Sequence, residues 1–211
     1  MNGSFFIRAR RAALIAMVVT WATPAVAGAP WTHDGFMLRL TLGLGYEDLS
    51  LGERRTDIDI SGFGASFSAT AGGVIAPDFA IHGSAFGLAA VDPNYSLNGR
   101  DVETLGIHSA VSLAGLAIGV TYWFMPLNIY LSPSIGVAKT SFELEGDEAE
   151  IHGKSDFGFV FRLVAGKEWW VATAWGIGVM AEFTWANVPV EVDSWSASFL
   201  GFNVGVSATF N

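Results

Sequence analysis

The chain has 211 residues, of which 51% are hydrophobic and only 15% are charged, and it contains no cysteine. Soluble domains carry about 25% charged residues, so this composition indicates a surface that is largely removed from water. Disulfide bonds and thiolate metal sites are excluded, and the formal net charge of −9 is opposite to that of a nucleic-acid-binding protein.

The first element, residues 1–27, has the three regions of a signal peptide. Three arginines precede an apolar run at 12–21, and Ala25-Val26-Ala27 forms an A-x-A cleavage site. A membrane anchor is the alternative, but the run is shorter than the ~20 residues of a spanning helix, and Pro24 interrupts its end. We expect residues 28–211 to be the mature protein, with 8 basic and 20 acidic residues and a net charge of −12.

The mature chain alternates apolar residues with small or polar ones. In the run that begins at Phe157, the aromatic residues share one parity, and Gly158, Val160 and Arg162 share the other. Such a period of two predicts a strand, because a helix would scatter the aromatic residues around its axis. The same pattern occurs at 38–46, 63–70, 116–124, 129–137, 157–168, 175–185 and 200–210. Residues 79–91 are an eighth expected strand, whose parity is ambiguous.

Four charged residues within these strands share a face with Gly, Ser and Thr: Arg39, Arg162, Glu168 and Glu182. The opposite face is apolar, which is the reverse of a water-soluble barrel, our alternative. Hydrocarbon outside and a polar interior explain this arrangement, and lipid requires a closed sheet without unpaired edges. We therefore predict an all-β fold, an eight-stranded antiparallel transmembrane β-barrel in the bacterial outer membrane.

The expected connections alternate between short and long. Short turns are expected at 76–78, 125–128 and 171–174, which is typical of the periplasmic end of such barrels. The four long connections together carry the net charge of −12, with −3, −2, −5 and −2 in chain order. Solvated loops are the simplest interpretation; divalent-cation binding is the alternative, since carboxylates suit hard cations. The long connections are 47–59, 92–103, 143–156 and 187–194.

Two charges are expected to meet inside the barrel. Arg162 and Glu182 are equally distant from a turn centred near residue 172, so we expect them to face each other directly across two strands. We interpret them as a structural ion pair in the lumen, with a gating or proton-path role as the alternative. Trp123, Tyr130 and Met180 share the inward parity and are expected to obstruct the lumen.

The export signal, the eight alternating strands and the C-terminal aromatic strand resemble the small outer-membrane β-barrel superfamily of OmpA transmembrane domains and OmpX/Ail-like proteins. The resemblance implies outer-membrane lipid and the barrel-assembly machinery as partners. It also implies an assembly signal near the C-terminus, although Asn211 follows the terminal aromatic residue here. That signal comprises Phe202, Val204, Val206, Ala208 and Phe210.

One short motif resembles an enzyme element. His82-Gly83-Ser84 is similar to the His-x-Ser element of lipid A deacylases, in which histidine activates serine, but it follows an expected periplasmic turn and lacks an evident acid partner. We expect no enzyme activity, cofactor or metal. The expected function is a structural or surface-interaction role through acidic extracellular loops toward an unidentified extracellular partner. A narrow passive pore is the alternative, and a lipid A-modifying enzyme is third.

Overall fold

The computed structural model describes residues 33–53, 56–91, 93–97, 100–102, 108–145, 150–189 and 196–211. The predicted signal peptide, residues 1–27, lies outside the described residues and stays a prediction. The described residues contain no helix long and apolar enough to cross a membrane.

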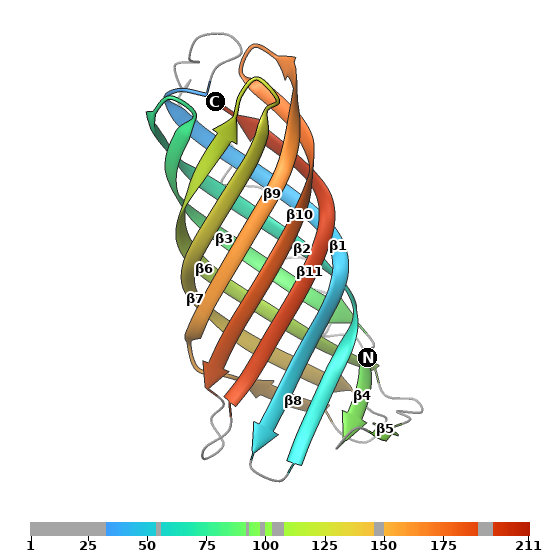
Figure 1. Ribbon diagram of the computed structural model, residues 1–211. Helices are drawn as coiled ribbons and strands as arrows, with labels where there is room; N and C mark the ends of the chain where they lie inside the picture. Colours follow the sequence, from blue (N-terminus) through green and yellow to red (C-terminus); the bar gives the residue numbers. More distant parts are fainter. Residues whose placement is uncertain are drawn as a thin grey trace, which may run out of the picture.

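Eight long strands form one closed antiparallel barrel (Figure 1). Neighbours in the barrel are consecutive along the chain, and the last strand pairs with the first, from Leu38 opposite Phe210 to Gly52 opposite Ser196. The predicted fold class is therefore confirmed. The strands are β1 (Phe36–Glu53), β2 (Thr56–Ala76), β3 (Phe79–Val91), β6 (His108–Phe124), β7 (Ile129–Glu145), β9 (Gly158–Ala172), β10 (Trp175–Pro189) and β11 (Ser196–Phe210).

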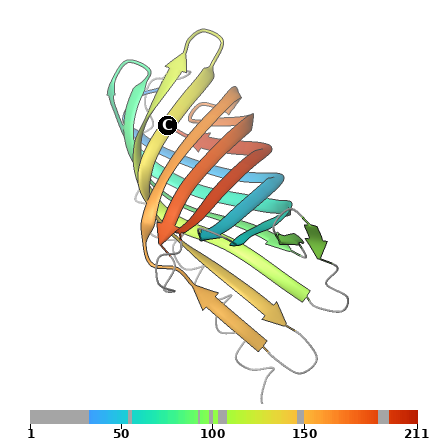
Figure 2. The same cartoon turned by 60° about the horizontal axis from the view of Figure 1, so that its bottom comes forward.

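Several strands are longer than predicted. The segment 47–59 was expected to be a loop, but β1 and β2 stay paired as far as Glu53 opposite Thr56. Backbone pairing continues past the apolar stretch because the ladder needs no apolar side chains, so the alternation pattern marks only the part in contact with lipid. Three short strands also lie within the expected long connections, at one end of the barrel (Figure 2): β4 (Asn94–Leu97), β5 (Arg100–Val102) and β8 (Glu150–Lys154).

The opposite end carries the short turns, as predicted, and is called the short-turn end below; the other is the long-loop end. Asp78 and Asn128 adopt positive φ angles of 59° and 51° there, a conformation that Asp and Asn tolerate better than most residues. The C-terminus lies at this end (Figure 1), where the backbone amide of Asn211 donates to the carbonyl oxygen of Ala174 over 3.0 Å.

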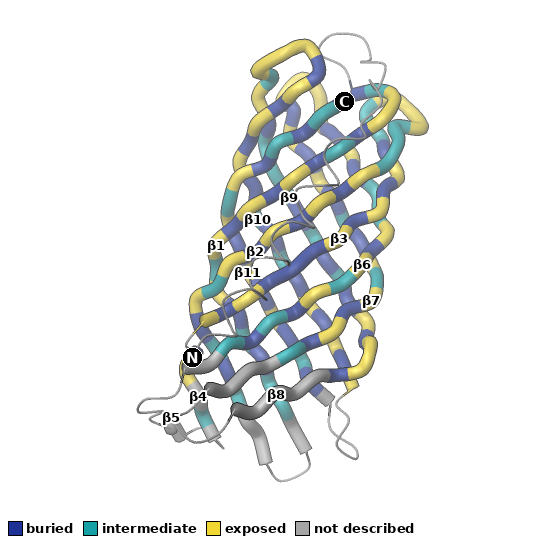
Figure 3. Tube along the Cα trace, turned by 180° about the vertical axis from the view of Figure 1, so that it is seen from behind, coloured by how far each residue is buried: buried dark blue, intermediate teal, exposed yellow. Residues whose placement is uncertain are grey.

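Buried and exposed residues alternate along the strands (Figure 3), as the period of two predicted. Outward side chains such as Leu44 and Phe63 are largely exposed, while Arg39, Arg162 and Glu182 are buried inside. The ambiguous parity of 79–91 is also resolved. Phe86 and Leu88 of β3 are buried, whereas Ile81 and Val91 face outward.

Candidate functional site

The lumen is the candidate site because most of the buried polar side chains converge there. At the short-turn end Trp123 and Tyr130 are fully buried, and Arg39 and Glu168 are almost so. Trp123 and Tyr130 obstruct the lumen as the sequence predicted, joined by Met180. This layer is called the polar plug below; it consists of Arg39, Trp123, Tyr130, Glu168 and Thr209.

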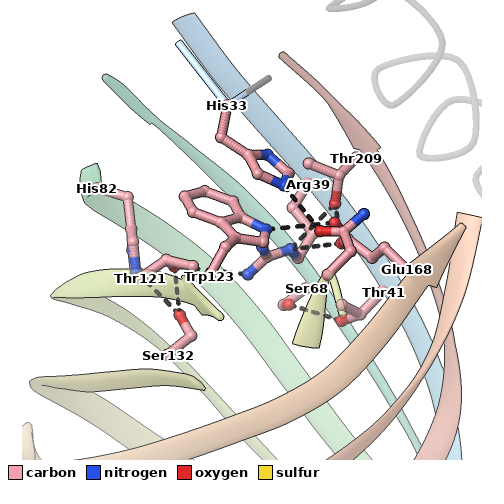
Figure 4. Close-up of polar contacts among 11 residues, drawn as sticks. His33, Arg39, Thr41, Ser68, His82, Thr121, Trp123, Ser132, Glu168 and Thr209 are labelled. Carbon is pink, nitrogen blue, oxygen red and sulfur yellow. Dashed lines mark hydrogen bonds and ion pairs between the residues drawn. The ribbon is translucent and has the colours of Figure 1, made fainter. Parts of the chain in front are cut away.

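An ion pair holds the polar plug together (Figure 4). Arg39 Nε lies 3.3 Å from Glu168 Oε1 and donates to Thr209 Oγ1 over 3.1 Å. The Arg39 guanidinium lies over the ring of Tyr130, 3.7 Å from its centroid. Trp123 Nε1 donates to Glu168 Oε2 over 3.4 Å. Aromatic rings and charged hydrogen bonds thus surround both members of the pair, as burial of a charge requires.

His33, which precedes β1, caps the polar plug (Figure 4). Its ring stacks on Trp123 with centroids 4.1 Å apart, and Nε2 lies 2.8 Å from Asn128 Oδ1. Burial lowers the pKa of His33 below its ordinary value of 6.5, although the hydrogen bond to Asn128 acts in the opposite direction. The short-turn mouth is therefore closed by a largely neutral imidazole.

Glycine makes room for the largest side chain of β7 in this layer. A Cβ atom on Gly166 would lie 2.6 Å from the ring atoms and hydroxyl of Tyr130. Tyr130 therefore occupies the space that the side chain of any other residue at position 166 would need. The small residues that the sequence places inside are thus paired with large ones from neighbouring strands.

The middle of the lumen contains the predicted ion-pair residues. Arg162 Nε and Nη2 donate to Glu182 Oε1 over 3.0 and 2.7 Å, and Thr184 Oγ1 donates to the same oxygen over 3.0 Å. The predicted register was wrong: Arg162 pairs with Thr184, and Glu182 with Val164. The turn lies later than assumed, since Ala172 already pairs with Trp175, and beyond the register shift at Trp175/Gly176 the ladder is centred on residue 173 instead of 172. The two charges meet diagonally, because a long arginine side chain spans that separation.

The long-loop half of the lumen is apolar, which corrects the prediction of a polar interior throughout. Its buried cluster, called the apolar layer below, draws side chains from all eight long strands. The members are Leu49, Ile60, Phe86, Leu88, Val111, Leu113, Ala117, Ala138, Val160, Ala186, Val188, Ala197 and Phe199.

Glu47 lies at the boundary beside the apolar layer. Its side chain is buried and accepts a hydrogen bond from Asn203 Nδ2 over 3.0 Å. A Cβ atom on Gly201 would meet Glu47 Oε2, Leu88 and Phe199 together, which places that oxygen beside apolar groups. Glu47 therefore belongs to the lumen and not to the acidic loop 47–59 expected from the sequence. Within the described ranges no basic side chain forms an ion pair with it.

His82 and Ser84 do not contact each other. His82 Nε2 lies 3.0 Å from Ser132 Oγ, which in turn lies 2.8 Å from Thr121 Oγ1 (Figure 4). Ser84 Oγ is buried and has no hydrogen-bond partner among the described residues. The motif that resembled a deacylase element therefore supplies two separate lumen residues. Among the residues that the structure describes, no three His, Asp or Glu side chains lie close enough together to hold a metal ion.

The C-terminal strand β11 presents its apolar parity outward. Phe202, Val204 and Val206 are more than half exposed, and Phe210 lies edge-on to Trp175 with ring centroids 5.3 Å apart. Ala208 lies between Leu40 of β1 and Ile177 of β10. The residues of the predicted assembly signal thus form a stripe on the lipid-facing wall.

These features together define the class of protein. A closed antiparallel barrel with a mostly apolar outer wall, aromatic residues at its ends and buried ion pairs in its interior is an outer-membrane β-barrel.

Comparison with solved structures finds barrels of the same kind. The attachment invasion locus protein Ail of Yersinia pestis is 11% identical, with 82% of this chain and 99% of that chain covered and a TM-score of 0.42. OprG of Pseudomonas aeruginosa is 12% identical, covering 86% and 99% with a TM-score of 0.49. Neisserial surface protein A is 9% identical, covering 87% and 98% with a TM-score of 0.49. No protein-family model and no curated protein matches the sequence.

Proposed function

We propose that this protein is a sealed outer-membrane barrel with a structural or surface-interaction role, exerted through its acidic extracellular segments. The observation that carries the proposal is the packing of the lumen. The polar plug, the Arg162–Glu182 pair and the apolar layer follow one another along the barrel axis, and their large side chains are almost completely buried. Eight strands enclose a space that side chains can just fill.

A sealed lumen leaves the outer surface as the place where function resides. With Glu47 assigned to the lumen, the four segments predicted as long connections carry a net charge of −11 instead of −12. The most acidic is 143–156, with six acids and one lysine. A surface of one sign attracts partners of the other sign and raises their association rate. The partner class that fits is therefore a cationic peptide or protein surface.

The Arg162–Glu182 pair serves a structural role in this proposal. Arg162 donates to Glu182 inside the lumen, and the apolar layer separates the pair from the long-loop end. The proposal includes no catalytic role, because the two residues considered for one do not contact each other: His82 contacts Ser132, and Ser84 Oγ has no hydrogen-bond partner among the described residues.

Binding of a fluorescent oligolysine peptide to the mature barrel in lipid vesicles tests the surface role. We expect binding that weakens with added salt, because screening shortens the electrostatic range to about 8 Å at physiological ionic strength. Exchanging Glu143, Glu145, Asp147, Glu148 and Glu150 for their amides should remove most of it. Asp78→Asn, at the short-turn end, is the control and should bind like the parent. Equal binding by the five-fold variant and the parent would contradict the proposal.

A further inference from the structure

The outer wall of the barrel contains an apolar groove near the short-turn end. It has a volume of about 440 Å³ and runs over β1, β11 and β10, with Trp169 of β9 at one side. Its floor is Ala208, which pairs with Leu40 on one side and Ile177 on the other. The small alanine between two larger apolar residues leaves the wall hollow at this point.

The groove faces hydrocarbon. Leu40, Leu42 and Val206 in its lining are about half exposed and belong to the outward parity of their strands. Water would find almost no hydrogen-bond partners in such a groove, so an acyl chain is the occupant that fits its chemistry. Its volume also falls within the range of about 300–1,000 Å³ that is usual for ligand sites.

A cation lies beside the groove. Lys167 has the outward parity of β9 and pairs with Val179, which lines the groove. Its ammonium lies 5.4 Å from the ring centroid of Trp169, another lining residue, and donates to the carbonyl oxygen of Leu127 in a short turn. An ammonium has three donors, so this bond leaves donors for a second acceptor. Lysines near the end of a membrane span direct their charge to the headgroup level in this way.

We propose that the groove is a phospholipid site, in which one acyl chain lies over Ala208 and the lipid phosphate binds Lys167. Two observations point to this class of ligand: the apolar hollow and the cation of matching charge at its short-turn side. Because the short turns face the periplasm in such barrels, the lipid belongs to the periplasmic leaflet.

Native mass spectrometry of the mature barrel, released from micelles doped with phosphatidylglycerol, tests the groove. We expect one retained lipid per barrel. Ala208→Leu fills the hollow and should lower retention at least about fivefold, by the usual cost of overpacking. Ala85→Leu is the control, an outward alanine of β3, which pairs with neither β1, β10 nor β11, and should retain the lipid. Equal retention by the parent and Ala208→Leu would overturn the site.

The phosphate contact is tested with diacylglycerol of the same acyl chains, which lacks the phosphate. Lys167→Ala should lower phosphatidylglycerol retention about twofold to fivefold, as for a partly exposed ion pair, and leave diacylglycerol retention unchanged. Lys139→Ala is the control, since Lys139 lies against Phe157 at the long-loop side. Unchanged phosphatidylglycerol retention in Lys167→Ala would overturn the assignment of the phosphate.

A photoactivatable phospholipid gives a test that needs no variant. Illumination in micelles should label residues of β1, β10 and β11 around Ala208 in the unmodified barrel. Labelling spread evenly over the outer wall would show that the groove holds no particular lipid.

Discussion

Arg162 is enclosed in the middle of the lumen. Its guanidinium donates twice to Glu182 and lies 4.2 Å from the centroid of the Phe86 ring. The other oxygen of that carboxylate, Glu182 Oε2, has no partner among the described residues. Removal of the arginine would therefore leave a buried charge with little compensation beyond Thr184.

The first prediction concerns this pair. Arg162→Ala should lower the free energy of unfolding by about 3–5 kcal/mol, because an uncompensated buried charge is costly. The double change with Glu182→Ala should recover part of the loss. Urea unfolding in micelles of both single variants and the double variant measures the coupling. Strictly additive effects would show that the two side chains do not interact.

His33 predicts a dependence of stability on pH. Its pKa is lowered in the folded protein, so the unfolded chain binds a proton first as pH falls below 6.5. The contribution of the neutral, stacked imidazole to stability is therefore complete above that pH and is lost progressively below it. We expect the parent to lose more unfolding free energy than His33→Phe between about pH 7.5 and about pH 5. The other histidines are present in both proteins. An equal loss of unfolding free energy in the parent and in His33→Phe would therefore contradict this role of His33.

Gly166 tests the packing of the polar plug. Gly166→Ala should destabilise the barrel by about 1–3 kcal/mol, the usual cost of overpacking, because the new methyl group meets the Tyr130 ring. Gly83→Ala is the matched control, since its Cβ would meet only the carbonyl oxygen of Ala117, at 3.9 Å. Thermal unfolding of the two variants side by side should separate them. A similar loss of stability in Gly166→Ala and Gly83→Ala would mean that the contact with Tyr130 is unimportant.

At the scale of the strands, alternation in the sequence predicts most of what the structure contains. It works where one face meets lipid and the other is polar, as in β9 and β10. It was ambiguous in β3 because Phe86 and Leu88 face the apolar layer while Ile81 and Val91 face lipid, so both parities are apolar. It could not give the β9–β10 register, which depends on the position of the turn after Ala172 and on an irregularity beside it at Trp175/Gly176.

The C-terminal strand carries the prediction about assembly. We propose that the outward stripe of β11 is read by the barrel-assembly machinery, as the resemblance to small outer-membrane barrels implied. Phe202→Ala should then slow the appearance of the folded, heat-modifiable form in cells, with only a small effect on refolding in micelles. The control is Phe63→Ala, another outward phenylalanine, which packs edge-on against Tyr46 with centroids 5.7 Å apart. Equal assembly rates for the two variants would contradict a signal in β11.

At the scale of the whole molecule, the lumen is divided along its axis. In the short-turn half, buried charged and polar groups pack among Trp123, Tyr130 and Met180, whereas aliphatic side chains and phenylalanines form the cluster of the long-loop half. The sequence did not reveal this division, because most residues of the apolar layer lie beyond the predicted strand segments, as Val188 does in β10. Among the described residues, three buried carboxylates and two buried arginines lie inside the barrel, and the amide of Asn203 donates to Glu47 in place of a base.

The central claim is that the barrel is sealed. Conductance of the mature protein in a planar lipid bilayer tests it most directly, with a water-filled porin in the same lipid as the positive control. The packed polar plug and apolar layer predict a baseline current, without long-lived steps, at either polarity. Reproducible steps of long duration from the folded protein would contradict the sealed lumen and favour a pore.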